Sequence, residues 1–151
     1  MNTIKELIYK YKAIYGWDIL CSPLRRNLEF AKRIRGIVSE KDFLERCICN
    51  RMRHQQRLRQ NAVDIAIREL EKEWTIIESC SDFESLYDII YNTIAKRSDD
   101  SKTWISHCTV YDTSLRIGYS LGDSILPDKY IYVHRHLVKN AIMLLAYKGQ
   151  M

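Results

Sequence analysis

Glycine and proline are scarce in this chain, and their scarcity limits what it can fold into. The 151 residues include only five glycines and two prolines, the residues on which tight turns most depend. Neither residue occurs between Val38 and Cys80, while apolar residues recur there at the spacing of an amphipathic helix. The sequence therefore predicts a chain built mainly from long helices.

Local start and stop signals divide the chain into helices. Serine, threonine and aspartate cap free amides at a helix start, a glutamate three residues on can complete a capping box, and glycine commonly ends a helix. These signals predict helices over about 3–15, 22–35, 39–80, 81–95, 109–121 and 136–148. The stretch 39–80 fits either one very long helix or two helices with a break near 54–60. The expected starts are Thr3, Ser22-Pro23, Ser39, the Ser81/Glu84 capping box and the Thr109/Asp112 pair; the expected stops include Gly16, Gly36 and Gly122.

These segments predict an all-α fold, with residues 1–151 forming a single domain of six or seven helices. The length is sufficient to bury roughly two-thirds of the unfolded surface without a disulfide or metal. The polar stretch 96–102 is the best candidate for an internal division. The segment 130–133 suits one short strand as well as a helix, because it is rich in β-branched and aromatic residues.

Composition excludes several classes of protein. No apolar run approaches the roughly 20 residues of a membrane span, and the N-terminal segment carries charges too early for a signal peptide. We therefore expect a cytoplasmic protein without membrane contact. The five cysteines are an odd number at scattered spacings, which favours reduced thiols over disulfides.

Recognised cofactor and metal motifs are missing. The sequence contains no GxxxxGK[ST], GxGxxG, GxSxG or HExxH pattern. Cys47 and Cys49 on a helix diverge, and His134 and His136 share a face only on a strand, so neither pair fits the ligand spacing of a structural zinc site. We expect no cofactor and no metal.

Positive charge is concentrated in the first half of the chain. Residues 1–60 contain 14 Lys and Arg against six acids, whereas residues 61–151 contain ten against 13. Arginine forks suit phosphate groups, and a basic surface that follows phosphates is typical of nucleic-acid binding. The candidate nucleic-acid-binding residues are Arg25, Arg26, Arg33, Arg46, Arg51, Arg53, Arg57 and Arg59.

Two other interpretations of these arginines stay open: a solvated helix face balanced by nearby acids, and a docking surface for an acidic protein partner. Oligomeric state and the choice between DNA and RNA are not predictable from the sequence. Aromatic residues can add base stacking, although tyrosines at helical spacing are more often core or rim residues. The tyrosines concerned are Tyr111, Tyr119, Tyr130 and Tyr132.

The segment Val110-Tyr111-Asp112-Thr113-Ser114-Leu115-Arg116-Ile117-Gly118 resembles the helix after the hairpin in helix-hairpin-helix DNA glycosylases, which has the form V-D-T-x-V-x-R-[VI]. The resemblance implies that Asp112 lies at a helix start, where it stabilises positive charge developing on the sugar, and that Arg116 matches the family's arginine. The glycine-rich hairpin of that family is replaced here by Thr103-Trp104-Ile105-Ser106-His107-Cys108.

A longer run also resembles a set of bacterial proteins with the pattern Y-D-T-[AS]-x-R-I-G followed by P-[DE]-K-x-[IV]-Y-[LV]-H. Residues 111–134 carry this pattern, which ends at His134. Asp112, Arg116 and His134 are therefore the candidate catalytic residues. For Asp112 a helix cap is favoured over a catalyst, because a carboxylate at a helix start accepts amides and meets the positive end of the dipole.

Three functions follow, in decreasing order of preference. The first is a non-enzymatic nucleic-acid-binding protein that uses an arginine-rich helical face. The second is a glycosylase-like or nuclease-like DNA-processing enzyme acting through Asp112. The third is a protein-interaction subunit of a larger bacterial assembly, such as a defence system.

Overall fold

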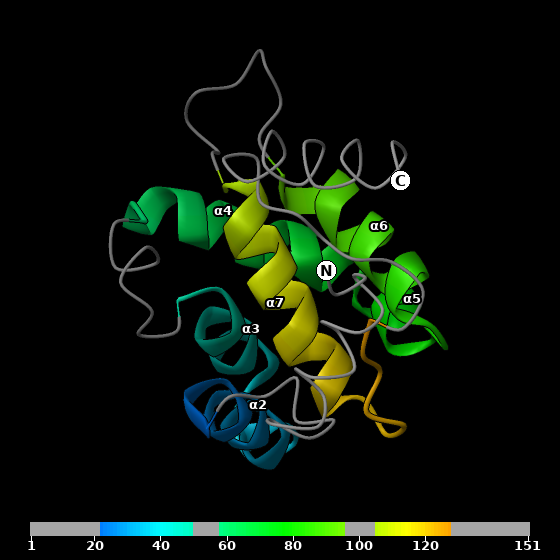
Figure 1. The fold of residues 1–151 in the computed structure, drawn as a ribbon. Helices are drawn as coiled ribbons and strands as arrows, with labels where there is room; N and C mark the ends of the chain where they lie inside the picture. The colour runs from blue at the N-terminus through cyan, green and yellow to red at the C-terminus, as the bar shows by residue number, and fades with distance from the viewer. Residues whose placement is uncertain (1–21, 50–57, 96–104, 128–151) are drawn as a thin grey trace, which may run out of the picture.

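The computed structural model of the chain describes residues 22–49, 58–95 and 105–127 (Figure 1). These residues form α-helices and no sheet; one isolated parallel bridge joins Ala95 to Ile105. The all-α prediction is therefore confirmed for the described part of the chain. The helices are α2 (Ser22–Ile34), α3 (Glu40–Ile48), α4 (Gln60–Lys72), α5 (Trp74–Glu78), α6 (Phe83–Ile94) and α7 (His107–Ser120).

Helix α7 lies at the centre of the described residues, where it packs against α2, α3 and α6 (Figure 1). Helix α4 bridges α3 and α6, and α5 continues from α4 toward α6. The buried apolar side chains of all these helices belong to one core cluster. Each fully buried leucine, isoleucine or phenylalanine contributes about 1.5–3 kcal/mol to that core.

Buried serine and threonine residues also occur on α7, and carbonyl groups of the same helix accept from three of their hydroxyls. The Thr113 hydroxyl donates to the Thr109 carbonyl and the Ser114 hydroxyl to the Val110 carbonyl, both at 2.7 Å. The Ser120 hydroxyl donates to the Ile117 carbonyl at 2.6 Å. Buried hydroxyls bonded in this way avoid the cost of an unpaired polar group, so a helix with polar residues can occupy the centre of the core.

Gly118 permits α7 to approach its neighbours closely. A Cβ atom at this position would lie 2.6 Å from the Ile125 carbonyl oxygen and 3.0 Å from Leu86 Cδ2. The Ile125 amide donates to the Gly118 carbonyl at 2.8 Å, which holds the segment after α7 against the helix. Only glycine leaves room for this contact.

Helix α2 and the start of α3 agree with the sequence prediction. Gly36 has φ +81°, a left-handed conformation that favours glycine and ends the helix before it. Ser39 then caps α3, its side chain accepting from the Asp42 amide at 3.1 Å. Gly36 and Ser39 act on the backbone next to them, which explains why the sequence predicts this helix end and this helix start.

The single long helix over 39–80 is wrong. Helix α3 ends at Ile48, Cys49 leaves helical geometry at φ −102° and ψ 36°, and α4 begins only at Gln60 after an extended Arg59. The two-helix alternative is closer but incomplete: the interruption starts at Cys49, earlier than 54–60, and α5 follows α4 as a third helix after the non-helical Glu73. Both helices bury an apolar face against the common core, which requires a change of chain direction that no glycine or proline marks.

Two predicted caps are also corrected. The cap of α6 is Asp82 rather than Ser81: its carboxylate accepts from the Ser85 amide at 2.8 Å and from the Ser85 hydroxyl at 2.9 Å. Helix α7 starts at His107 with Ser106 as its cap, bonded to the Thr109 amide at 3.3 Å. The expected cap at Asp112 is therefore wrong. The predicted helices 3–15 and 136–148, the strand 130–133 and the loop 96–102 lie outside the described residues.

Candidate functional site

Three of the eight predicted nucleic-acid-binding arginines lie on the exposed side of α2. Arg25, Arg26 and Arg33 are exposed, whereas Leu28 and Ala31 on the same helix are buried in the core. Arg26 and Arg33 are seven residues apart, which is about two helical turns and places them in one line. The outer face of α2, defined by Arg25, Arg26 and Arg33, is therefore a small basic surface.

The other two basic residues at the C-terminal end of α2 contact the rest of the protein. Lys32 Nζ donates to Ser124 Oγ at 2.7 Å and lies 5.2 Å from the centre of the Tyr119 ring. Arg35 Nη1 donates to the Ser120 carbonyl at 3.2 Å, at the C-terminal end of α7. Lys32 and Arg35 thus connect α2 to the end of α7 and its following segment.

The remaining predicted arginines are distributed differently. Arg46 is exposed on α3, and Arg59 is exposed immediately before α4. Arg51, Arg53 and Arg57 lie outside the described residues. Among the described residues, Arg25, Arg26 and Arg33 are therefore the predicted arginines that lie together on one helix.

Arg116, a candidate catalytic residue, is buried in the core. Only 1% of its surface is exposed. Its Nε donates to Asn27 Oδ1 at 2.7 Å, and its Nη1 donates to the Cys47 carbonyl oxygen at 2.5 Å. Cys47 lies in the last turn of α3, where carbonyls lack helical partners and the dipole is negative. Arg116 therefore caps α3 from α7 and is inaccessible to a substrate.

Asp112 lies one turn before Arg116, inside α7 and half-buried. Burial lowers the pKa of Arg116, and the negative charge of Asp112 opposes that shift. Because a carboxylate four residues from an arginine lies on the same helix face, Asp112 acts as a counter-charge for the buried guanidinium. His134 lies outside the described residues, so the catalytic set of three is not assembled among them.

The tyrosines considered for base stacking pack against other side chains. The Tyr111 ring makes edge contacts with Phe83 at 6.0 Å and with Tyr87 at 6.5 Å between ring centres. Burial raises the pKa of Tyr111, and the negative charge of Asp112 adds to the effect. The Tyr119 hydroxyl donates to Glu29. Both are half-buried, as expected for rim residues; Tyr130 and Tyr132 lie outside the described residues.

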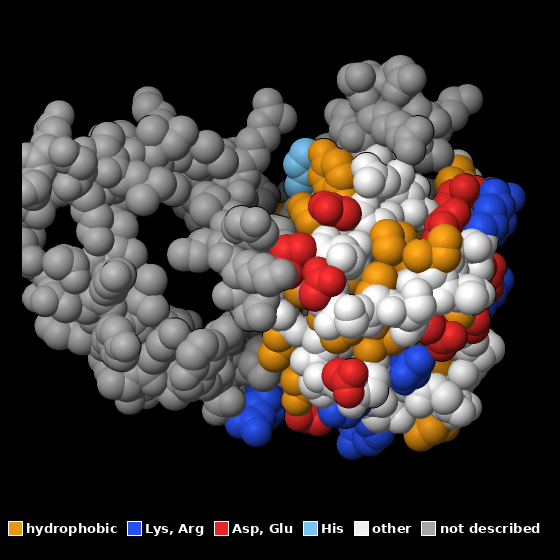
Figure 2. Space-filling model, turned by 90° about the vertical axis from the view of Figure 1, so that its right-hand side faces the viewer, with side chains coloured by type: hydrophobic (Ala, Val, Ile, Leu, Met, Phe, Trp, Pro, Cys, Tyr) orange, Lys and Arg blue, Asp and Glu red, His pale blue; other side chains and the backbone are white. Residues whose placement is uncertain are grey.

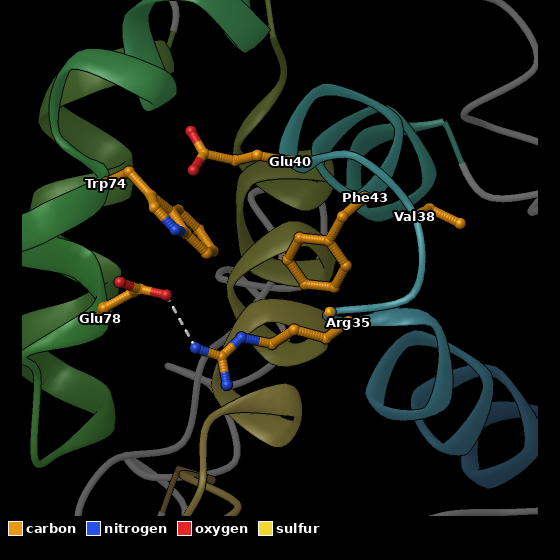
Figure 3. A pocket seen from close by; sticks show the side chains of 7 residues that line it. Arg35, Val38, Glu40, Phe43, Trp74 and Glu78 are labelled. Carbon is orange, nitrogen blue, oxygen red and sulfur yellow. Dashed lines mark hydrogen bonds and ion pairs between the residues drawn. The ribbon is translucent and has the colours of Figure 1, made fainter.

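A pocket that sequence reasoning missed lies between the α2–α3 turn, α3 and α5 (Figure 3). Its volume is about 280 Å³. Figure 3 shows the Phe43 and Trp74 rings turned toward each other, with Glu40 near one end of the pocket and the Arg35–Glu78 pair near the other. The spacings Glu40–Phe43 and Trp74–Glu78 were visible in sequence, but each also fits an ordinary amphipathic helix. The lining residues are Arg35, Gly36, Val38, Glu40, Phe43, Trp74 and Glu78.

The pocket has excess negative charge. Arg35 Nη2 pairs with Glu78 Oε1 at 2.9 Å. Partial burial raises the pKa of Glu40, and the charges of Glu71 and Glu78 raise it further. Three carboxylates therefore act on a region that contains one guanidinium, and that guanidinium is already paired.

The described cysteines are thiols that form no disulfide among the described residues. Cys47 is fully buried, and Cys49, Cys80 and Cys108 are partly buried. Burial raises the pKa of the Cys47 thiol to about 12. Among the described residues, no group of three His, Cys, Asp or Glu side chains is placed to hold a metal ion, and no helix there is long and apolar enough to cross a membrane.

Comparison of the chain with known protein families, curated proteins and solved structures found no match.

Proposed function

We propose that this protein binds nucleic acid without catalysis, using the outer face of α2. The observation that carries the proposal is the exposure of Arg26 and Arg33 on the side of α2 opposite to the buried Leu28 and Ala31, with the exposed Arg25 beside them. Arginine forks bind phosphate oxygens through two parallel hydrogen bonds. A row of such side chains on a rigid helix suits a phosphate backbone.

The distribution of charge along the described helices supports this choice of surface. Residues 22–35 contain five Lys and Arg and one acid, whereas residues 60–94 contain two Lys and Arg and eight acids. The side of the molecule turned to the viewer in Figure 2 shows acidic side chains spread among apolar and uncharged ones, and no broad basic patch. A polyanion approaching this protein would be attracted to α2 and repelled from α4–α6.

The catalytic alternative receives less support from the described residues. A general acid or a phosphate-contacting residue must reach its substrate, and Arg116 is 1% exposed. Asp112 is half-buried beside Arg116. We therefore assign these two residues to the stability of α7 rather than to a reaction.

Fluorescence anisotropy with labelled single-stranded and duplex DNA and RNA, over a salt series, tests the proposal. The test variant is Arg26→Ala/Arg33→Ala. The control is Lys41→Ala/Arg68→Ala, which removes two exposed positive charges from α3 and α4. Each phosphate contact contributes about 0.9 to the slope of log affinity against log salt on duplex DNA. The test variant should therefore reduce the slope by roughly two if both arginines contact phosphate.

The control should leave the slope within about 0.5 of the wild-type value, because its two residues lie outside the proposed surface. A wild-type slope near zero for all four nucleic acids contradicts the proposal. Equal losses in the two variants would show attraction by net charge alone, without a binding surface on α2, and contradict it as well.

A further inference from the structure

The pocket beside α5 combines aromatic walls with carboxylates, and nucleic-acid binding by α2 does not use it. The centres of the Phe43 and Trp74 rings are 5.8 Å apart, in an edge-on arrangement at 65°. Glu40 and Glu78 line the same cavity. We propose that this pocket binds an organic cation, namely a guanidinium or alkylammonium group on a short aliphatic stem.

The aromatic wall suits a cation with an apolar stem. Indole has the strongest attraction of the aromatic side chains for a cation over its face. Trp74 is half-buried, so part of its surface is open, and Figure 3 shows its ring directed toward the cavity. Phe43, which also lines the cavity, provides apolar contacts for the methylene groups of such a ligand.

The carboxylates determine the sign of the ligand's charge. Glu78 is paired with Arg35, and Arg35 also donates to the Ser120 carbonyl, so its guanidinium has fixed partners. The Glu40 carboxylate makes no hydrogen bond with another described residue, and this exposed residue lines the pocket. The neighbouring charges of Glu71 and Glu78 raise the pKa of Glu40, which means that a bound cation would relieve repulsion between carboxylates.

Other ligand classes fit less well. An anion would face the carboxylates of Glu40 and Glu78 and an arginine that is already paired. A neutral apolar ligand would remove water from Glu40 without replacing its hydrogen bonds, which is unfavourable. A metal ion is disfavoured because no group of three ligating side chains is assembled among the described residues.

The size of the cavity limits the ligand further. A volume of about 280 Å³ is at the lower end of small-molecule sites, which span roughly 300–1,000 Å³. One arginine or lysine side chain, or a free amine of similar length, fits this space. The proposed class is therefore small, and the proposed site would not hold a nucleotide.

The experiment is a titration of the full chain followed by two-dimensional amide NMR, with the Trp74 indole signal assigned by a Trp74→Phe variant. The probes are N-acetyl-arginine methylamide and its citrulline counterpart, which has a similar shape but no charge. The arginine probe should bind with a dissociation constant on the order of 1 mM, as expected for one side chain in a shallow pocket. The Trp74 indole should shift with it, and the citrulline probe should leave that signal unchanged.

Glu40→Gln keeps the shape of the side chain but removes its charge. It should raise the dissociation constant of the arginine probe roughly tenfold, because a charge-assisted contact is lost. Asp88→Asn makes the same change of charge on α6, at an exposed residue that does not line the pocket, and should leave binding unchanged. Trp74→Phe should weaken binding about threefold, since phenylalanine attracts cations less than indole.

A parallel titration with agmatine distinguishes a free amine from the side chain of a peptide. Tighter binding of agmatine assigns the site to a free small cation. Tighter binding of N-acetyl-arginine methylamide assigns it to an arginine side chain of a peptide. Absence of binding by either cation at about 10 mM would overturn the proposal. Equal binding of the citrulline probe, or equal effects of Glu40→Gln and Asp88→Asn, would also overturn it. None of these variants alters the outer face of α2, so failure here leaves the nucleic-acid proposal unaffected.

Discussion

Helices α2 and α7 pack against each other and both carry arginine, yet they use it in opposite ways. On α7, Arg116 is 1% exposed and its guanidinium bonds to Asn27 and to the carbonyl of Cys47. On α2, Arg26 and Arg33 are exposed. The difference arises from position: α7 is covered by three helices, whereas α2 contacts the core on one side. Counting arginines in the sequence therefore overestimates the basic surface of the protein.

Arginines also stabilise helix ends in this molecule. Arg116 donates to a carbonyl in the last turn of α3, and Arg35 donates to the carbonyl of Ser120, the last residue of α7. Cations at these positions satisfy unpaired carbonyls and interact favourably with the helix dipole. Arg35 and Arg116 thus stabilise the fold. They differ from the exposed arginines of α2 because they donate hydrogen bonds to backbone carbonyls at helix ends.

The largest predicted effect comes from replacing the buried arginine. Arg116→Met keeps a long side chain and good helix propensity but removes the hydrogen bonds to Asn27 and Cys47. It should lower the free energy of unfolding by about 3 kcal/mol, because the acceptors and the nearby carboxylate of Asp112 stay partly buried without their cation. Arg26→Met, the same change on the outer face of α2, should alter stability by less than about 0.5 kcal/mol.

Urea denaturation followed by circular dichroism measures both variants. Arg116→Lys should recover only part of the loss, because a single ammonium group cannot reproduce the planar fork that reaches two acceptors. Equal stability of Arg116→Met and Arg26→Met would contradict the assignment of Arg116 to the core.

Glycine offers a second contrast, between the last turn of α7 and the segment that follows it. Gly118→Ala should destabilise the protein by about 2 kcal/mol, because its methyl group would meet the Ile125 carbonyl at 2.6 Å, and the overpacking cost exceeds the gain of roughly 1 kcal/mol in helix propensity. Gly122 has open space around its Cβ position and no positive φ. Gly122→Ala should therefore be neutral or slightly stabilising.

Thermal denaturation of these two glycine variants is the simplest measurement, since both add one methyl group. If Gly118→Ala is as stable as Gly122→Ala, the close contact between α7 and the segment after it does not limit the fold.

Local signals explain the parts of the fold that were predictable. Helix α2 and the start of α3 were predicted within one or two residues, because Gly36 and Ser39 act on the backbone beside them. The cap of α7 was placed at Thr109 and Asp112 rather than at Ser106, although a serine three residues before Thr109 was available as a signal. The break after Ile48 had no local mark, because it follows from packing α3 and α4 on one core.

The candidate sites depended on contacts between distant residues and were less predictable. The acceptors of Arg116 lie 89 and 69 residues away in the sequence, so nothing near Arg116 indicated its burial. Similarly, the pocket forms where Phe43 of α3 meets Trp74 of α5. In contrast, the exposure of Arg26 and Arg33 followed from the positions of Leu28 and Ala31, because burial on one side of a helix exposes the other.

The last predicted effect is a pH dependence and concerns the thiol of Cys47, whose carbonyl accepts the hydrogen bond from Arg116. Burial raises the pKa of this thiol from 9.0 to about 12, so between pH 9 and pH 12 the unfolded chain loses the thiol proton while the folded chain keeps it. Stability from this group is complete below pH 9 and falls as pH rises, by about 1 kcal/mol per pH unit.

Cys47→Ala should therefore show a shallower loss of stability than wild type from pH 9 to pH 11 in urea denaturation. Cys80→Ala is the matched control, since Cys80 is only partly buried, and its slope should stay closer to wild type. If the stability of both variants falls with pH as steeply as that of the wild type, the interior around Cys47 and Arg116 is open to hydroxide. The contrast between the buried arginine of α7 and the exposed arginines of α2 would then be weaker than their exposed fractions indicate.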